Sequence, residues 1–514
     1  DYCMTTTSEK TKEPGRTPSM FASLLVLGVM ITLILLSVAL FGSTVADGPL
    51  QVSMTLAAIF ALGVAMYYGF RGSLISEAIS SGVNGAIGTV FVIIAIGAVI
   101  GTLYLSGSVA AFVYYGVAII SPKVFYVTVF LIASVVSSLL GSSLTTVGAI
   151  GIAFVGLASI VGVNPAIAAG AAVSGAIVGN KIAKISDTAN LTVATVGGLT
   201  IDEHSRMVVR TAIPTVLISA LLFLLLGLLG GSADGAVDVA QVQGTIAQYF
   251  NVSLLAFVPV LLIFVLSALH FSAYMSLTLS AIFAVVLAAF TQHDLIVSLA
   301  ADPSLSYFEA ILKVGIDTFT NGFHLNSGVE QLDTLFSGGG VAGMLTTVWL
   351  VLMAASFGAV VGYTGMLQRI ITPVINRTKG PASLILVTML TSIGMNFATA
   401  DPYTSVVLTG RMFRQEFIKE RLKPVLLSAS MADSGTIFSH IIPWNIHGAL
   451  FAGTLGLATL SWAPYTFLAY LTPIVTFVMV YVHYMRKDQL ASDEDAEKGY
   501  GDEPSQLPKS TQLA

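Results

Sequence analysis

Charged residues are scarce in this sequence. Asp, Glu, Lys and Arg make up 10% of its 514 residues, whereas hydrophobic residues make up 55%. Soluble domains carry about 25% charged residues, so this composition cannot cover a surface that faces water. Together with a mean hydropathy of +0.88, it predicts an integral membrane protein. The net charge of −5 gives no reason to expect a nucleic-acid partner.

Cysteine and the common catalytic motifs are also missing. Cys3 is the only cysteine, which excludes an intrachain disulfide and a thiolate metal cluster. The sequence contains no His-Glu-x-x-His and no P-loop, so a zinc protease and ATP hydrolysis within this chain are disfavoured. We therefore expect a protein that is not an enzyme and that needs no cofactor.

Long apolar runs are abundant instead. A bilayer core needs about 20 apolar residues per helix. Suitable windows lie at 20–42, 49–70, 83–105, 208–230, 252–270, 272–291, 341–364 and 462–485. Lys10, Lys12 and Arg16 precede the first window, and Arg486 and Lys487 follow the last. The positive-inside rule then predicts a multi-pass protein of the cytoplasmic membrane with both termini in the cytoplasm.

Four further apolar stretches, at 124–162, 165–200, 381–416 and 424–456, are interrupted near their middle by polar residues, Gly or Pro. Backbone polar groups cannot stay unpaired in hydrocarbon. Such breaks survive only where protein or a water-filled cavity surrounds them. They predict discontinuous helices and re-entrant hairpins around a wet interior, within roughly twelve membrane segments in all.

The interruptions repeat along the chain. Gly97–Gly101 has a counterpart in Gly358–Gly362, and a broken hairpin followed by a broken helix comes after each. Corresponding points lie about 260 residues apart, a pattern typical of the two halves of a secondary transporter. Chance similarity between apolar segments is the alternative. We favour inverted halves because inversion supplies alternating access.

The expected fold is thus an all-α polytopic membrane protein built from two repeats. Its expected parts are a disordered cytoplasmic tail (1–19), N-terminal membrane helices (20–80), a first transport repeat (81–230), a connecting loop with linking membrane helices (231–340), a second transport repeat (341–460), a last membrane helix (461–486) and a second disordered cytoplasmic tail (487–514). Residues 366–378 are expected to form a short interfacial helix.

Three carboxylates, Asp187, Asp401 and Asp433, each lie at one of the breaks. A charge at the bilayer centre costs at least about 2.5–3.5 kcal/mol, so such residues are candidates for function. Hard oxygen ligands suit Na⁺, and a desolvated carboxylate can instead hold a proton. Competition between the two ions at these residues would give antiport. Neutral ligands nearby are Asn180, Ser186, Thr188, Asn190, Ser434, Thr436 and Asn445.

Each carboxylate also has a structural interpretation. Asp187 could pair with Lys181 or Lys184, because buried charges usually pair. Asp401, which precedes a proline, could cap a hairpin, and Asp433 could be the N-cap of a helix.

Other polar residues carry weaker expectations. Lys181 or Lys184 could instead contact a carboxylate substrate. We interpret His440 and His447 as buried, hydrogen-bonded histidines, and 202–206 as a solvated loop.

The broken segments resemble those of the NhaC-type Na⁺/H⁺ antiporter family, a branch of the ion-transporter superfamily. The matching residues are Gly179-Asn180-Lys181, Ser186–Leu191, Asp401 with Gly410-Arg411-Met412, and Asp433–Thr436 with Ile442–Asn445. The resemblance covers most of 80–460. It implies an inverted-repeat fold with re-entrant hairpins and a secondary transporter of the cytoplasmic membrane. Some members exchange Na⁺ for H⁺, and others couple ion movement to malate and lactate exchange.

The chain departs from the family pattern at four places. Asn180 and Ala432 stand where the family usually has Asp and Glu, Ala183-Lys184-Ile185 replaces Ser-Pro-Leu, and His440 replaces Pro. A positive charge near the site would favour an anionic or zwitterionic substrate.

We expect Na⁺/H⁺ antiport by alternating access, with Na⁺ and H⁺ as the transported ions. The alternative is a Na⁺- or H⁺-coupled carrier of an organic acid or an amino acid. An ion channel is disfavoured because duplicated, broken halves fit a carrier better. The expected partners are small ions and the lipid bilayer, and the sequence leaves open a homodimer.

Overall fold

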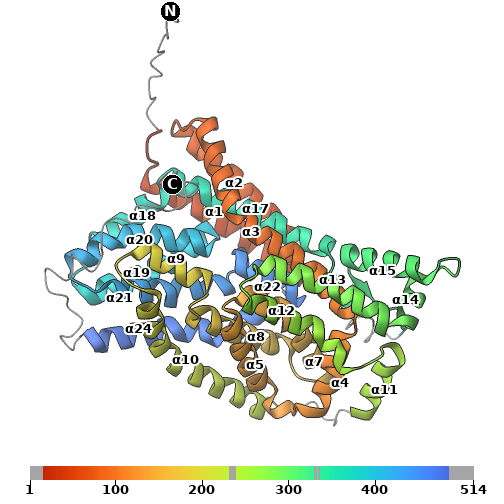
Figure 1. Cartoon of the computed structure of the whole chain (residues 1–514). Helices are drawn as coiled ribbons and strands as arrows, with labels where there is room; N and C mark the ends of the chain where they lie inside the picture. The colour runs from red at the N-terminus through yellow and green to blue at the C-terminus, as the bar shows by residue number, and fades with distance from the viewer. Residues whose placement is uncertain (1–14, 231–238, 329–332, 334–335, 485–514) are drawn as a thin grey trace, which may run out of the picture.

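The computed structural model describes residues 15–230, 239–328, 333 and 336–484. These residues form helices almost throughout (Figure 1). The first half contains α1 (Met20–Phe41), α2 (Pro49–Tyr67), α3 (Gly72–Leu105), α4 (Ser108–Ile119), α5 (Phe125–Leu140), α6 (Ser143–Thr146), η3 (Val147–Gly151), α7 (Ile152–Val161), α8 (Pro165–Ile182), α9 (Asp187–Val196) and α10 (Ile201–Leu229).

A linking region follows, with α11 (Val239–Tyr249), α12 (Val258–Ala268), α13 (Ala273–Thr291), α14 (His293–Ala300), α15 (Tyr307–Asn321), β1 (Phe323–His324) and β2 (Ser337–Gly338). The two strands pair antiparallel, with Phe323 opposite Gly338.

The second half contains α17 (Val341–Tyr363), α18 (Met366–Ile375), α19 (Pro381–Thr399), α20 (Pro402–Lys419), α21 (Pro424–Met431), η5 (Ala432–Thr436), η6 (Ser439–Ile441), α22 (Ile446–Leu455), α23 (Thr459–Trp462) and α24 (Phe467–Tyr484). The two tails expected at 1–19 and 487–514 fall largely or wholly outside the described residues.

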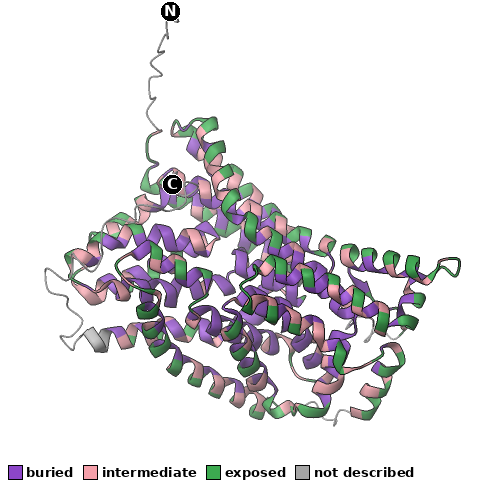
Figure 2. Ribbon diagram, in the orientation of Figure 1, coloured by how far each residue is buried: buried purple, intermediate pink, exposed green. Residues whose placement is uncertain are grey.

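Many of these helices can cross a bilayer. Within the described ranges ten helices are long and apolar enough, and the number rises to 13 if each of three bent helix pairs forms one span. Helices at the periphery bury only one stripe, while α8 is buried over most of its length and α3 over its C-terminal part (Figure 2). Large apolar side chains that remain exposed, such as Leu35 and Leu217, suit a lipid environment. The expected all-α polytopic fold is confirmed.

The four predicted interruptions are present as well. The first hairpin, residues 125–161, turns at Gly141, whose positive φ of 67° suits a residue without a side chain. The second hairpin, residues 381–419, turns at Ala400 and Asp401. The first broken helix is interrupted at 183–186, between α8 and α9. The second bends by 42° at 442–445, before α22.

The two halves present these elements in the same order: a long helix, a short helix, a hairpin and a broken helix. α4, α5, α8 and α9 start at residues 108, 125, 165 and 187, and α18, α19, α21 and α22 start at 366, 381, 424 and 446. The order of elements in the first half therefore recurs in the second. α3 spans Gly72–Leu105, so the expected domain boundary after residue 80 falls inside one helix.

The hairpins approach the interior from opposite ends of α10. At the start of the first hairpin, the backbone of Lys123 lies against Gly227, near the end of α10. Just after the second hairpin, Ser428 of α21 bonds to His204 in the first turns of α10. This placement is consistent with inverted halves, which stay a prediction.

Candidate functional site

Within each half, the hairpin tip contacts the neighbouring helix break. In the first half, Gly141 at the tip of the first hairpin packs against Ile185 of the first broken helix. In the second half, the backbone N–H of Ile446 donates to the carbonyl of Ala400 at 3.0 Å, and the indole N–H of Trp444 donates to Phe397 at 2.9 Å. In the second half the hairpin tip thus supplies a partner for a backbone N–H next to the helix break, as the expected breaks require.

A histidine pair joins the halves. His440 Nε2 lies 2.9 Å from the Ser143 hydroxyl at the first hairpin tip. The His440 and His447 rings stack with centroids 4.4 Å apart, and Ser439 Oγ bonds to His447 Nδ1 at 2.7 Å. Both histidines are buried, so their interpretation as buried, hydrogen-bonded residues is confirmed.

The most buried charges form one ion pair beside the helix breaks. Lys181 Nζ lies 2.9 Å from Asp433 Oδ1, and neither side chain is more than 2% exposed. The Thr211 and Thr476 hydroxyls donate to Asp433 Oδ2 at 2.6 and 2.7 Å, and Lys181 Nζ also donates to Thr211 Oγ1 at 2.9 Å. A buried pair needs this number of hydrogen bonds because desolvation of each ion costs several kcal/mol.

This pairing corrects three expectations. Lys181 does not pair with Asp187, because the last turn of α8 directs its side chain to Asp433 of η5. Lys184 lies beyond the end of α8, 63% exposed, and pairs with exposed Asp202. It is therefore outside the buried site. Asp433 is not an N-cap, since it lies within a continuous helical stretch that runs through the π-helical turn η5. Such turns often mark functional sites.

The first break gathers small polar groups. Ser186 Oγ donates to Asn180 Oδ1 at 3.1 Å and lies 3.1 Å from Thr188 Oγ1, and all three side chains are buried. Asp187 and Asn190 are exposed by comparison, with the Asn190 amide bonded to the carbonyls of Lys184 and Ser186. The break therefore divides its predicted ligands between the interior and an accessible face.

Asp401 serves as the N-cap of α20. Its Oδ2 accepts from the Thr404 N–H at 2.7 Å and from the Thr404 hydroxyl at 2.6 Å, and Oδ1 accepts from the Tyr403 N–H. The capping alternative is thus confirmed. Asp187 and Asp401 both interact electrostatically with the Tyr403 hydroxyl, so these two carboxylates lie in one neighbourhood where α9 packs on α20.

The cap and an ion-binding role of Asp401 can be separated by substitution. Asn caps a helix about as well as Asp, whereas Ala costs about 0.5–2 kcal/mol. We expect Asp401→Ala to lower the thermal unfolding midpoint in detergent and Asp401→Asn to leave it nearly unchanged. If Asp401 also binds Na⁺, both variants will raise the Na⁺ concentration needed for half-maximal flux. If Asp401→Asn leaves this Na⁺ concentration unchanged, Asp401 acts only as a helix cap.

The remaining predicted ligands of the second half differ in whether their side chains have hydrogen-bond partners. Ser434 Oγ donates to the Ser430 carbonyl, and Asn445 caps α22 and donates to Asn396. Thr436 is buried, and its hydroxyl has no partner among the described residues.

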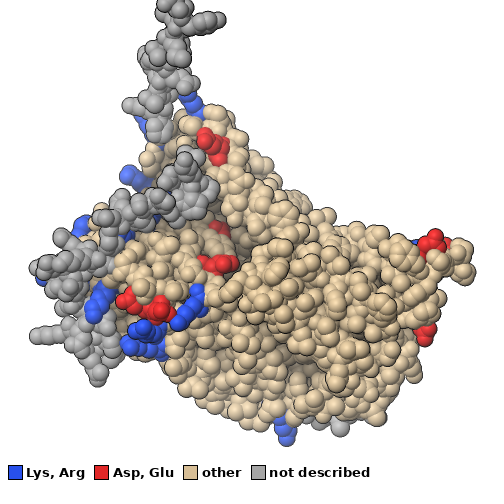
Figure 3. All heavy atoms as spheres, viewed as in Figure 1, with Lys and Arg blue, Asp and Glu red and all other residues tan. Residues whose placement is uncertain are grey.

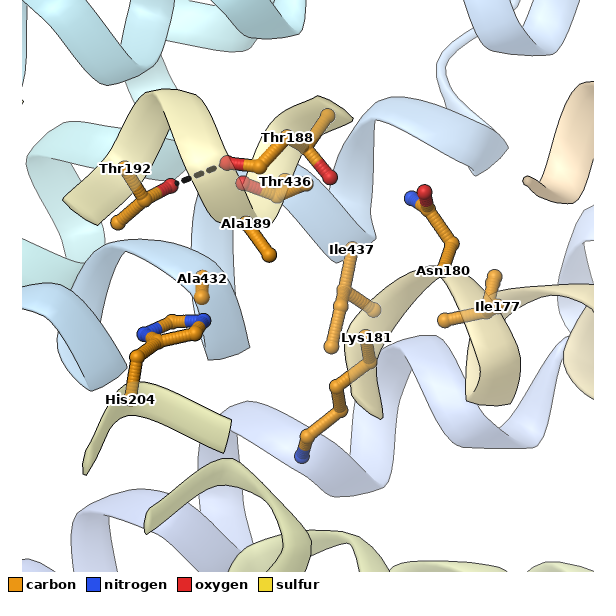
Figure 4. Close-up of a pocket in the computed structure, with 10 residues that line it drawn as sticks. All are labelled: Ile177, Asn180, Lys181, Thr188, Ala189, Thr192, His204, Ala432, Thr436 and Ile437. Atoms are coloured by element: carbon orange, nitrogen blue, oxygen red, sulfur yellow. Dashed lines mark hydrogen bonds between the residues drawn. The ribbon is translucent and has the colours of Figure 1, made fainter. Parts of the chain in front are cut away.

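Thr436 opens onto a small cavity of about 10 Å³ between α8, α9, α10 and η5 (Figure 4). Its lining residues are Ile177, Asn180, Lys181, Thr188, Ala189, Thr192, His204, Ala432, Thr436 and Ile437. A cavity of this size holds about one water molecule. It joins polar atoms of the two broken helices, which the sequence places far apart.

Sequence reasoning missed several of these residues. His204 and Thr211 lie on α10, and Thr476 lies on α24. The sequence predicts ordinary membrane spans at 208–230 and 462–485 and a solvated loop at 202–206. Asp202 and Glu203 are exposed as expected, but His204 is only 1% exposed. The available signal was a polar stripe at helical spacing along an otherwise apolar helix, namely His204, Thr211, Thr215 and Ser219.

Several known proteins are similar to this chain in amino-acid sequence. The family model for the Na⁺/H⁺ antiporter family matches residues 184–483. The Na⁺/H⁺ antiporter NhaC of Alkalihalophilus pseudofirmus is 31% identical over 460 residues, which cover 90% of this chain and 95% of the relative. NhaC of Bacillus subtilis is 30% identical, covering 84% and 92%. The malate-2H⁺/Na⁺-lactate antiporter of Bacillus subtilis is 26% identical, covering 88% and 93%. The chain, a multi-pass membrane protein, belongs to the Na⁺/H⁺ antiporter family.

Proposed function

We propose that this protein is a secondary active transporter that exchanges Na⁺ for H⁺ across the cytoplasmic membrane by alternating access. The observation that carries the proposal is the Lys181–Asp433 pair, fully buried among hydroxyl groups where the broken helices meet. A carboxylate surrounded by hydroxyl oxygens suits a hard cation, and the ammonium beside it carries an exchangeable proton.

Charge balance links the two ions. A buried carboxylate that loses its positive partner is destabilised by about 3–5 kcal/mol. Asp433 therefore requires one positive charge, and either the Lys181 ammonium or a bound Na⁺ can supply it. When Na⁺ binds at Asp433, Lys181 gives up one proton and remains as a neutral amine. One Na⁺ thus replaces one H⁺ at this pair with no change in net charge.

The other predicted ligands lie around this pair. Asn180, Thr188 and Thr436 line the adjoining cavity and would supply neutral oxygens. Asp187 and Asp401 lie at the first helix break and the second hairpin tip, and we propose that they attract Na⁺ on its way to Asp433. Ser186 and Asn445 would hold the breaks in shape, and Ser434 would stabilise the π-helical turn η5, through the hydrogen bonds described above.

Charge distribution supports a cytoplasmic location for both termini. Lys and Arg gather on one side of the molecule, while most of the remaining visible surface is uncharged (Figure 3). Arg16 precedes α1, and Arg206 lies in the first turns of α10. The turn after α20 adds Arg421 and Lys423. We assign this side to the cytoplasm by the positive-inside rule. The basic residues expected after the last span lie outside the described residues.

One of the observations that favour an organic acid or an amino acid as the substrate does not hold in the structure. Lys184, which together with the carboxylates missing at Asn180 and Ala432 favours an anionic substrate, lies at the surface paired with Asp202. The small cavity also suits one dehydrated ion better than a carboxylic acid.

The direct test is ion flux in reconstituted vesicles. We expect protein-containing vesicles to change their internal pH on a Na⁺ pulse, and a pH gradient alone to drive uptake of ²²Na⁺. Asp187→Asn should slow this flux. Vesicles that respond to neither gradient would refute the proposal, and flux that appears only with malate, lactate or an amino acid would establish the alternative cargo.

A further inference from the structure

His204 has an unusual position in the first turns of α10. Its side chain is 1% exposed. Nδ1 lies 2.5 Å from the Ser428 hydroxyl of α21, whereas Nε2 is buried with no partner among the described residues. Buried polar atoms nearly always have a hydrogen-bond partner. The free nitrogen belongs to a residue that reaches into the cavity from below Ala432, with Thr188 and Thr192 opposite (Figure 4).

The same ring lies between the surface and the buried ion pair. Asp202 and Glu203, which precede His204, are exposed, and Asp202 is held at the surface by Lys184. On the inner side, Lys181 lines the same cavity, and its ammonium lies 2.9 Å from Asp433 Oδ1. Exposed residues and the buried His204 ring, which shares a cavity with Lys181, therefore lie within one turn of α10.

Building on the proposed antiport, we propose that His204 carries protons between the Lys181–Asp433 pair and the water at the start of α10. Imidazole can bind a proton at one nitrogen and release one from the other. In the outward direction an N–H bond of the Lys181 ammonium breaks, an N–H bond forms at Nε2 and the ring becomes imidazolium. Loss of the Nδ1 proton towards Ser428 and water leaves a neutral ring protonated at Nε2, and rotation of the ring then turns the unprotonated Nδ1 towards the cavity for the next proton.

The surroundings of the ring favour this role over others. Of the residues that line the cavity in the described chain, only Lys181 and His204 carry side chains that titrate near neutral pH or above. α9 contributes Thr188 and Thr192 to the lining and α21 contributes Ser428 as the Nδ1 partner, whereas η5 brings the Asp433 charge. Because neither side chain of the pair is more than 2% exposed, bulk water does not reach the pair in this conformation. When Na⁺ occupies Asp433, His204 is the other such titratable side chain that lines the cavity with Lys181.

The test separates proton movement from Na⁺ movement. Exchange of ²²Na⁺ for unlabelled Na⁺ at equal pH needs alternating access but no proton transfer, whereas Na⁺-driven H⁺ flux needs both. In vesicles containing His204→Gln, we expect ²²Na⁺/Na⁺ exchange within about two-fold of the unsubstituted protein and Na⁺-driven H⁺ flux reduced by about 100-fold, the scale of a lost acid–base group. His324→Gln, at an exposed histidine of β1, is the matched control and should leave both rates unchanged.

Two further variants keep the test decisive if glutamine disturbs folding. His204→Ala enlarges the cavity, and imidazole added to the buffer should restore H⁺ flux because it supplies the missing acid–base group. Ser428→Ala removes the Nδ1 partner and should slow H⁺ flux while it spares ²²Na⁺/Na⁺ exchange. Rescue by imidazole would not occur if His204 only packed against α21.

Several outcomes would overturn this role. Unchanged H⁺ flux in His204→Gln would do so, and so would an equal loss of both rates in all three variants, which would make His204 an ion ligand or a packing residue. Absence of Na⁺-driven H⁺ flux in the unsubstituted protein would instead refute the antiport on which this role depends, so the two failures are distinguishable.

Discussion

Asp433→Asn is expected to abolish Na⁺-driven H⁺ flux and to destabilise the protein. The substitution leaves the Lys181 ammonium buried at 2.9 Å from a neutral amide and removes the anion that would bind Na⁺. Breaking one side of a buried pair costs about 3–5 kcal/mol. Flux should therefore fall to that of empty vesicles, and the thermal unfolding midpoint in detergent should fall with it.

A double substitution separates stability from transport. Apolar residues in place of both ions remove the desolvation cost, so Lys181→Met with Asp433→Leu should recover most of the lost stability. Transport should stay absent because no carboxylate remains. Asp294→Asn, at a fully exposed side chain, is the control and should change neither property. Measurable Na⁺-driven flux in the double variant would show that Asp433 is not the exchange site.

Gly179→Ala is expected to be the most damaging apolar substitution near the site. Gly179 lies where α8 crosses α5, and a Cβ atom there would stand 1.9 Å from the carbonyl carbon of Ser137 and 2.2 Å from its oxygen. These are backbone atoms, which cannot rotate away as a side chain would. Overpacking typically costs about 1–3 kcal/mol and occasionally more, and we expect the upper end here. The measurement is the thermal unfolding midpoint of the purified variant.

Gly394→Ala provides the matched comparison in α19. A Cβ atom at that position meets no heavy atom within 4 Å, so the change should be neutral or should stabilise the helix by up to about 1 kcal/mol, because alanine is the better helix former. Because Gly179 lies two residues before Lys181, Gly179→Ala should also displace the Lys181–Asp433 pair and reduce flux. Equal unfolding midpoints for the two variants would mean that α5 and α8 do not pack as closely as described.

Local patterns were sufficient for the elements of this fold. Apolar windows of about 20 residues predict spanning helices, and polar residues inside such windows predict the breaks at 183–186, 400–401 and 442–445. Both kinds of signal lie in neighbouring residues, so one sequence reveals them. The repeated order of the breaks also identified the two halves. Asp401 was recognised at the correct turn, although its alternative roles as helix cap and as ion ligand remained open.

The partners of the charged residues were beyond local reasoning. Lys181 and Lys184 are three residues apart and look alike in the sequence, yet one is buried against Asp433 and the other is exposed beside Asp202. The difference arises because α8 ends at Ile182. One lysine projects from its last turn into the interior, and the other follows the break out to the surface.

The sequence by itself determined that this is a helical membrane carrier with two interrupted halves, because hydrophobic length and helix breaks are properties of contiguous residues. Only the tertiary structure decided which side chains share the site. The pairing of Lys181 with Asp433, and the contributions of Thr211, Thr476 and His204, depend on how α8, η5, α10 and α24 cross. The cost of burying a charge forces each such residue to find a partner, but packing of distant helices determines which partner it finds.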